Sequence, residues 1–187
     1  MDIDKYSAGP CPIGRGLVMV GDAWSTLILR DAGLGLTRFD QFRSSLGIAP
    51  NILTRRLTAL TKAGLLEKKN YRKRPPRDEY LITEAGRDFL PILQVIGAWG
   101  RRHNGGGDLS YVVDAETGEA IDPVVIDRQT GAAIGTRPLR LVRPVAFVAP
   151  IDADTQRPPA VRERPGSLRS SAPRSPKRPS PQQGDSP

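Results

Sequence analysis

An abrupt change in the spacing of apolar residues at Gly64 constrains the fold more than any other feature of this sequence. Over residues 50–63 the leucines recur every three or four positions, which is the spacing of one helix face, and Pro50 suits the first helical turn. After Gly64 the apolar period falls to two, which is typical of strands. A glycine at this point also favours a helix end in the left-handed conformation. We therefore expect a helix over residues 50–63 that is followed directly by β-structure.

Two alternating segments, residues 65–71 and 78–82, predict a β-hairpin. Their expected connection, residues 72–77, is basic and rich in proline. Helical spacing recurs on both sides of this unit, with Asp22 and Thr83 at positions that favour helix N-caps. The further helices that we expect begin at Pro12, run from Asp22 to Gly33, from Arg38 to Leu46, and from Thr83 to about Arg102.

Composition and periodicity divide the chain into four parts. They are an N-terminal arm (1–10), a helical domain with its hairpin (11–103), an extension (104–150) and a tail (151–187). The extension repeats the pattern Asp-x-x-Thr-Gly at Asp114 and Asp127, and each copy predicts a small hairpin whose turn holds the aspartate. The tail is rich in Pro, Ser and Arg without periodicity, so we expect it to be disordered. The predicted fold class is mainly α with a small β-wing (α+β).

Basic side chains are concentrated in residues 38–77. This window holds eleven Lys or Arg residues and two acidic residues, a net charge of +9, whereas the whole chain has a formal charge of +8. A solvated surface usually mixes both signs, while a cluster of one sign within a segment that can fold is typical of phosphate binding. The charge distribution therefore predicts a polyanionic partner.

Three helices followed by a basic hairpin form, in this order, a winged helix-turn-helix. A helix over residues 50–63 is about 20 Å long, which suits the major groove of double-stranded DNA. With the leucines facing the core, Asn51 and Arg55 face outward, and these residue types can read adenine and guanine edges. Arg56 lies nearer the leucines, where it can reach either a phosphate or an internal partner. The residues that we expect to bind DNA are Arg38, Pro50, Asn51, Thr54, Arg55, Arg56, Thr58, Lys62, Lys68, Lys69, Arg72, Lys73, Arg74 and Arg77.

Several motifs follow one another in a recognisable order between residues 10 and 103. They are Cys11-Pro12-Ile13, Trp24-Ser25-Thr26-Leu27-Ile28-Leu29-Arg30, Arg38-Phe39-Asp40-Gln41-Phe42, Leu53-Thr54-Arg55-Arg56-Leu57, Ala63-Gly64-Leu65, Pro75-Pro76-Arg77-Asp78-Glu79-Tyr80, Leu81-Ile82-Thr83-Glu84-Ala85-Gly86 and Trp99. Together they resemble the HxlR family of bacterial winged-helix transcriptional regulators, which are related to the MarR group. The resemblance implies a DNA-binding homodimer whose terminal helices pack across the two-fold axis, and we expect a repressor. The residues then expected at the dimer interface are Ile13, Leu17, Phe89, Leu93, Ile96 and Trp99.

Two positions depart from the pattern of this family. Ala49 precedes Pro50, where relatives usually carry serine, so the expected recognition helix lacks an N-cap worth about 1 kcal/mol and one phosphate contact. Asp78 stands in the hairpin where relatives commonly carry an apolar residue.

Cys11 is the sole cysteine of the chain, which excludes an internal disulfide. Some members of the family sense oxidants or electrophiles through a cysteine near the N-terminus, so the resemblance implies a sensor role for Cys11. A thiol beside a helix start also favours the reactive thiolate. The alternative is a small apolar residue packed beneath the terminal helices. Both a redox effector and a small-molecule effector stay open.

Other functional classes find less support in the sequence. Nucleophile–base pairs, metal clusters and phosphate-binding glycine loops do not stand out, so we expect neither an enzyme nor a cofactor. The apolar runs are shorter than the ~18 residues of a membrane span, and residues 1–5 do not form a signal pattern. We expect a cytoplasmic protein at the bacterial nucleoid, without a membrane partner. An alternative function is a regulatory interaction module, in which residues 108–150 bind a partner or small ligand and DNA contact is secondary.

Overall fold

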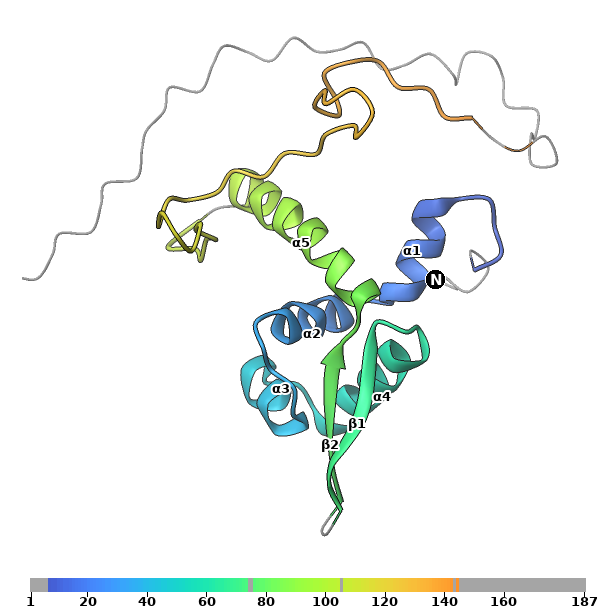
Figure 1. Cartoon of the computed structure of the whole chain (residues 1–187), viewed down its shortest axis with the longest axis vertical. Coiled ribbons are helices and arrows are strands. Elements are labelled where there is room, and N and C mark those ends of the chain that lie inside the picture. Colours follow the sequence, from blue (N-terminus) through green and yellow to red (C-terminus); the bar gives the residue numbers. More distant parts are fainter. Residues whose placement is uncertain (1–6, 74–75, 105, 143, 145–187) are drawn as a thin grey trace, which may run out of the picture. The chain divides into compact units, whose positions relative to one another are not determined.

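The computed structural model describes residues 7–73, 76–104, 106–142 and 144, and the side chains of residues 71–76 lie outside this description. The described part contains five helices and one antiparallel hairpin (Figure 1). In chain order they are α1 (Pro12–Val20), α2 (Ala23–Gly33), α3 (Phe39–Leu46), α4 (Pro50–Lys62), β1 (Leu66–Lys73), β2 (Pro76–Ile82) and α5 (Glu84–His103). This order confirms the predicted winged helix-turn-helix. The expected tail, residues 1–6 of the arm and Arg74 lie outside the described residues.

The hydrophobic core is built from α2, α3, α4 and the start of β1. The predicted leucine stripe of α4 is fully buried, with exposed fractions of 0 to 1%. Burial of one such side chain stabilises the fold by about 1.5–3 kcal/mol. The stripe therefore determines which face of α4 points inward. The core side chains are Ile28, Leu29, Ala32, Phe42, Ile48, Leu53, Leu57, Leu60, Leu65 and Leu66.

Helix ends lie where the sequence predicts them. Asp22 Oδ1 accepts the Ser25 amide at 3.0 Å at the start of α2, and Thr83 Oγ1 accepts the Gly86 amide at 3.1 Å at the start of α5. Both contacts satisfy amides that have no partner within the helix. Gly64 follows α4 with a φ of +73°, which confirms the predicted left-handed end.

The start of α4 has no side-chain cap, as the alanine at position 49 predicts. Instead, Asn51 Oδ1 accepts the amide of Ile52 at 2.9 Å. That amide is one of the four N–H groups that a helix leaves without an internal acceptor. Asn51 thus partly replaces the missing cap of this helix.

The hairpin is longer than the alternation of its residues predicts. Strand β1 runs to Lys73 and β2 begins at Pro76, so the expected connection is wrong at residues 72–73 and 76–77, and residues 74–75 lie outside the described part of the chain. The pairing contains an irregularity between Asn70 and Arg72. A proline is tolerated at the first residue of an edge strand, because no partner strand needs its missing N–H there.

A third extended segment joins the hairpin ahead of α3. The Tyr80 amide donates to the Thr37 carbonyl oxygen at 2.7 Å, and Arg38 forms a single β-bridge with Glu79. These contacts attach the hairpin to the start of α3.

In each copy of the repeat, the extension forms a turn that is closed by a single antiparallel bridge. Each copy of the repeat contains one β-bridge, Val113 with Ala120 and Ile126 with Ala133. Asp114 Oδ1 accepts the amides of Glu116 and Thr117 at 2.9 and 2.8 Å, which lowers the pKa of this carboxyl. Asp127 accepts the Gln129 amide at 3.0 Å and the Thr130 hydroxyl at 2.8 Å, so the turn role expected for both aspartates is confirmed.

Helix α5 has 20 residues, more than any other helix in the described part of the chain, and it continues through Pro91. Ile92, Ile96 and Trp99 are 50 to 59% exposed along it, although they are large and apolar. Within the described ranges, neither α5 nor another helix is long and apolar enough to cross a bilayer.

Candidate nucleic-acid interface

The outward face of α4 is polar and basic. Burial of the leucines on one side leaves the opposite side exposed, because successive residues turn by about 100° around a helix. The exposed side chains predicted to bind DNA on this face are Asn51, Thr54, Arg55, Thr58 and Lys62. Pro50 is also exposed, in the first turn.

The side chains on this face differ in the hydrogen bonds and ion pairs that they form within the chain. The hydroxyls of Thr54 and Thr58 donate to the carbonyl oxygens of Pro50 and Thr54, both at 2.9 Å, which leaves their oxygens as acceptors. Arg55 and Lys62 form no hydrogen bond or ion pair with any residue in the described ranges. These two cations are therefore available to a ligand without loss of an internal contact.

The Arg56 side chain contacts α2 of its own domain. Its Nη2 forms an ion pair with Asp22 Oδ2 at the start of α2, and only 26% of its side chain is exposed. The two alternatives from the sequence were a phosphate and an internal partner, and the structure contains the internal partner. Asp22 was predicted only as an N-cap, and its capping position carries no signal for this second contact.

The wing, defined as strands β1 and β2, carries cations that are partly neutralised. Lys68 Nζ lies 2.8 Å from Asp78 Oδ2, and Lys69 Nζ lies 3.3 Å from Glu67 Oε2. Arg77 is exposed on β2. Arg72 and Lys73 lie on β1, but their side chains are outside the described part, and Arg74 is outside it altogether.

The ion pair between Lys68 and Asp78 shifts the pKa of both groups. The hydrogen bond from Lys68 lowers the pKa of the Asp78 carboxyl below its ordinary 3.8, and the same bond raises the pKa of Lys68. A lowered carboxyl pKa means that the pair is intact at neutral pH and is lost only as the pH falls through that lowered value. At neutral pH, Asp78 therefore competes with phosphate for Lys68.

We expect Asp78→Asn to tighten binding to any DNA duplex about fivefold near 0.1 M salt, because one released lysine adds about one phosphate contact per wing. Fluorescence anisotropy with a random-sequence duplex measures this change. The matched control is Asp88→Asn, which removes a carboxylate from the exposed surface of α5. Equal tightening by both variants would mean that overall charge, and not Lys68, is responsible.

Arg38 lies at the junction of the wing and α3. It is the N-cap residue of α3, and its amide donates to Gln41 Oε1 at 2.9 Å. Its side chain is exposed.

The residues expected at a dimer interface fall into two groups. Ile13 and Leu17 of α1 and Ile96 and Trp99 of α5 are 50 to 72% exposed. Phe89 and Leu93 are half-buried, and Phe89 packs against the core of its own chain. The exposed four are thus left without a partner surface in the described part of the chain.

Cys11 is exposed at the N-cap of α1, where its Sγ accepts the Gly14 amide at 3.4 Å. The alternative of a residue packed beneath the terminal helices does not describe its environment in the single chain. A sensor role stays a prediction.

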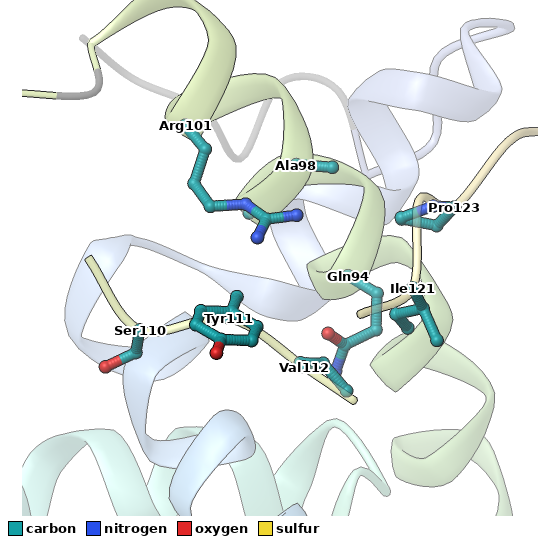
Figure 2. Close-up of a pocket in the computed structure, with 9 residues that line it drawn as sticks. Gln94, Ala98, Arg101, Ser110, Tyr111, Val112, Ile121 and Pro123 are labelled. Carbon is teal, nitrogen blue, oxygen red and sulfur yellow. The ribbon is translucent and has the colours of Figure 1, made fainter. Parts of the chain in front are cut away.

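A small pocket separates α5 from the extension. Figure 2 shows Gln94, Ala98 and Arg101 of α5 together with the residues of the extension that line the pocket, which are Ser110, Tyr111, Val112, Ile121 and Pro123. Its volume of about 60 Å³ suits a few waters and is far below the roughly 300 Å³ or more of a typical ligand site. A neighbouring groove of about 500 Å³ has mostly apolar walls, with Leu90, Val95, Val124 and neighbouring residues lining it.

Comparisons with known proteins agree with this architecture. Residues 19–107 match the family described as HxlR-like helix-turn-helix. The uncharacterized HTH-type transcriptional regulator Rv3095 of Mycobacterium tuberculosis is 37% identical over 127 residues, which cover 67% of this chain and 80% of the relative. The solved structure of PA1607, a candidate transcription factor, is 32% identical with a TM-score of 0.67, covering 75% of this chain and 99% of that chain. PA1374 of Pseudomonas aeruginosa, also a candidate transcription factor, is 39% identical with a TM-score of 0.53, covering 79% and 98%.

Proposed function

The chain belongs to the HxlR-like helix-turn-helix family, and we propose that it represses transcription by binding specific DNA sequences as a homodimer. The family and the fold support a DNA-binding transcriptional regulator. In this proposal α4 enters the major groove, and the wing contacts phosphates or the minor groove. Such a regulator acts on nucleoid DNA, so a cytoplasmic location follows from the proposal.

The single observation that carries the proposal is the exposed face of α4. Arg55 and Lys62 extend from it without a counter-charge in the described residues, and Asn51 lies beside them near the helix start. Arginine can donate two hydrogen bonds to guanine and asparagine can pair with adenine, whereas lysine suits a phosphate. This combination supports base recognition anchored by backbone contacts.

The exposed apolar residues of α1 and α5 support the homodimer. Soluble proteins seldom expose several large apolar side chains on two helices without a partner. A symmetric pair of chains would cover Ile13, Leu17, Ile96 and Trp99 and would present two copies of α4 to successive major grooves.

Two substitutions on α4 test the roles that we assign. We expect Arg55→Ala to weaken binding to a selected operator by about 1–3 kcal/mol and to relax the preference at one base pair. We expect Lys62→Ala to weaken binding to all sequences alike and to reduce the salt slope by about one per protomer. Both are measured by anisotropy on a duplex enriched from a random pool. Uniform weakening by Arg55→Ala would reassign this residue to the phosphate backbone.

A second candidate function, ligand or partner binding by the extension, is favoured by the groove of about 500 Å³ beside α5. Its volume lies in the range of small-molecule sites. A chain that ends after residue 104 separates the two candidates, because the DNA-binding proposal predicts that operator affinity survives within about threefold. Loss of all operator binding from a truncated chain that still folds would favour the extension as the functional part.

A further inference from the structure

Asp22 and Arg56 connect two helices that are far apart in the sequence. Asp22 Oδ2 forms an ion pair with Arg56 Nη2, while Asp22 Oδ1 accepts the Ser25 amide at 3.0 Å. One carboxylate therefore caps α2 and holds α4 at the same time. The two side chains are 30% and 26% exposed, so water screens the pair less than it screens a pair at the open surface.

The backbone of Asp22 forms hydrogen bonds through both its amide and its carbonyl oxygen. Its amide donates to the Val20 carbonyl oxygen at 3.2 Å, and its own carbonyl oxygen accepts from the Thr26 amide at 3.0 Å. Gly21, between α1 and Asp22, has a φ of +85° and donates to the Leu17 carbonyl oxygen at 2.8 Å. The carboxylate thus extends from a hydrogen-bonded junction between α1 and α2.

Arg56 has little freedom to leave this junction. On α4 it lies at the edge of the buried leucine stripe, while its neighbour Arg55 is exposed. Its Nε is buried and finds no hydrogen-bond acceptor among the described residues. A guanidinium in this position depends on Asp22, because a shielded charge without a counter-charge is strongly unfavourable.

We propose that Asp22 and Arg56 are positioning residues for DNA recognition, which set the orientation of α4 relative to the α1–α2 junction. The proposal rests on the proposed function of α4. Base readout requires side chains to be placed to within a fraction of an ångström, whereas attraction to phosphates tolerates small rotations. The pair therefore controls specificity more than total affinity. Because α1 carries exposed Ile13 and Leu17, the same contact relates α4 to the proposed dimer surface.

This role and a direct phosphate contact by Arg56 predict opposite effects for Asp22→Asn. Asparagine keeps an oxygen that can cap α2 but loses the negative charge. If Arg56 binds phosphate, removal of a competing carboxylate strengthens DNA binding. If the pair positions α4, the same substitution weakens operator binding although the protein has become more positive.

The experiment measures operator and random-duplex binding of the full chain by anisotropy, over a range of salt concentrations. The operator is a duplex enriched from a random pool by the wild-type chain. The variants are Asp22→Asn, Arg56→Gln, the double variant and Arg56→Lys, and the control is Asp78→Asn, which also removes one carboxylate. Thermal unfolding of each variant gives its folded fraction, so that dissociation constants refer to folded protein.

We expect Asp22→Asn and Arg56→Gln each to weaken operator binding about tenfold, and the double variant to be no worse than either, since coupled residues are not additive. Random-duplex binding and the salt slope should change little, and Arg56→Lys should recover part of the loss. Loss of folding alone would reduce apparent binding to both duplexes equally, and this reduction would disappear once the dissociation constants are corrected for the folded fraction.

Tighter operator binding by Asp22→Asn, as expected for Asp78→Asn, would overturn the proposal. A salt slope reduced by about one per protomer in Arg56→Gln would overturn it as well, because it identifies a phosphate contact. In both cases the proposed function survives, since the wild-type chain still binds the operator more tightly than the random duplex. If the wild-type chain itself does not prefer the operator, the proposed function fails, and this inference fails with it.

Discussion

Replacement of Gly86 by alanine is expected to lower the free energy of unfolding by about 3 kcal/mol, at the upper end of the cost of overpacking. Gly86 is buried in the first turn of α5. A Cβ atom at this position would lie 2.3 Å from the Leu65 carbonyl oxygen and 2.7 Å from Ile82 Cγ1. The first contact is with backbone, so α5 and the base of the wing must separate. Urea unfolding of the full chain measures the change.

Gly97→Ala is the matched control, because Gly97 lies in the same helix and a Cβ atom there meets nothing within 4 Å. Without a steric cost, alanine should stabilise the helix by up to about 1 kcal/mol. The two variants should therefore shift the unfolding midpoint in opposite directions. A neutral or stabilising Gly86→Ala would contradict the close approach of α5 to Leu65.

Ile96→Glu is expected to separate the proposed dimer and to weaken operator binding by about a hundredfold or more. Ile96 is half-exposed on α5 between Ile92 and Trp99, so a carboxylate there would be buried without a partner in a dimer. Two linked recognition helices gain about 10²- to 10⁴-fold in affinity over one, and a monomer loses this gain. Sedimentation equilibrium gives the association state and anisotropy gives the affinity.

Leu109→Glu provides the comparison for this variant. Leu109 is apolar and 44% exposed, close to the 50% of Ile96, but it lies in the extension and not on α1 or α5. Leu109→Glu adds the same negative charge as Ile96→Glu, so its effect on DNA affinity gives the contribution of general repulsion from DNA. A dimer that persists in Ile96→Glu would remove α5 from the proposed interface.

Local chemistry explains which parts of the fold could be predicted. The limits of α4 follow from Pro50, the leucine spacing and Gly64, all within one short segment, and the capping residues Asp22 and Thr83 act on amides three residues away. Each of these signals depends on nearby backbone geometry alone. They therefore appear in the sequence without knowledge of the tertiary structure.

Contacts between distant segments account for the errors and omissions. The proline-rich connection was predicted as a loop, but pairing with the opposite strand extends β1 and β2 to residues 73 and 76. The hairpins of the extension were predicted from the repeated Asp-x-x-Thr-Gly turn, and the sequence did not indicate that each copy pairs through a single bridge. The packing of Gly86 against Leu65 depends on a tertiary approach that no periodicity records.

In the candidate site, too, some features follow from the sequence and others depend on the tertiary structure. The outward orientation of Asn51 and Arg55 follows from the helical period, and their exposure agrees with it. The engagement of Arg56 by Asp22 and of Lys68 by Asp78 does not follow from spacing, since it depends on how α2 meets α4 and on the register of the wing. Residue type therefore predicts which side chains can bind DNA, and the tertiary structure decides which are free to do so.

The most direct test of DNA recognition is anisotropy of the wild-type chain on the duplex enriched from a random pool, from about 50 to 300 mM salt, with and without unrelated competitor DNA. We predict tight binding that survives the competitor and falls linearly on a log–log plot with a slope near −5, as about six neutralised phosphates require. Equal affinity for the competitor, or no binding to any duplex at the lowest salt concentration, would contradict a sequence-specific DNA-binding regulator.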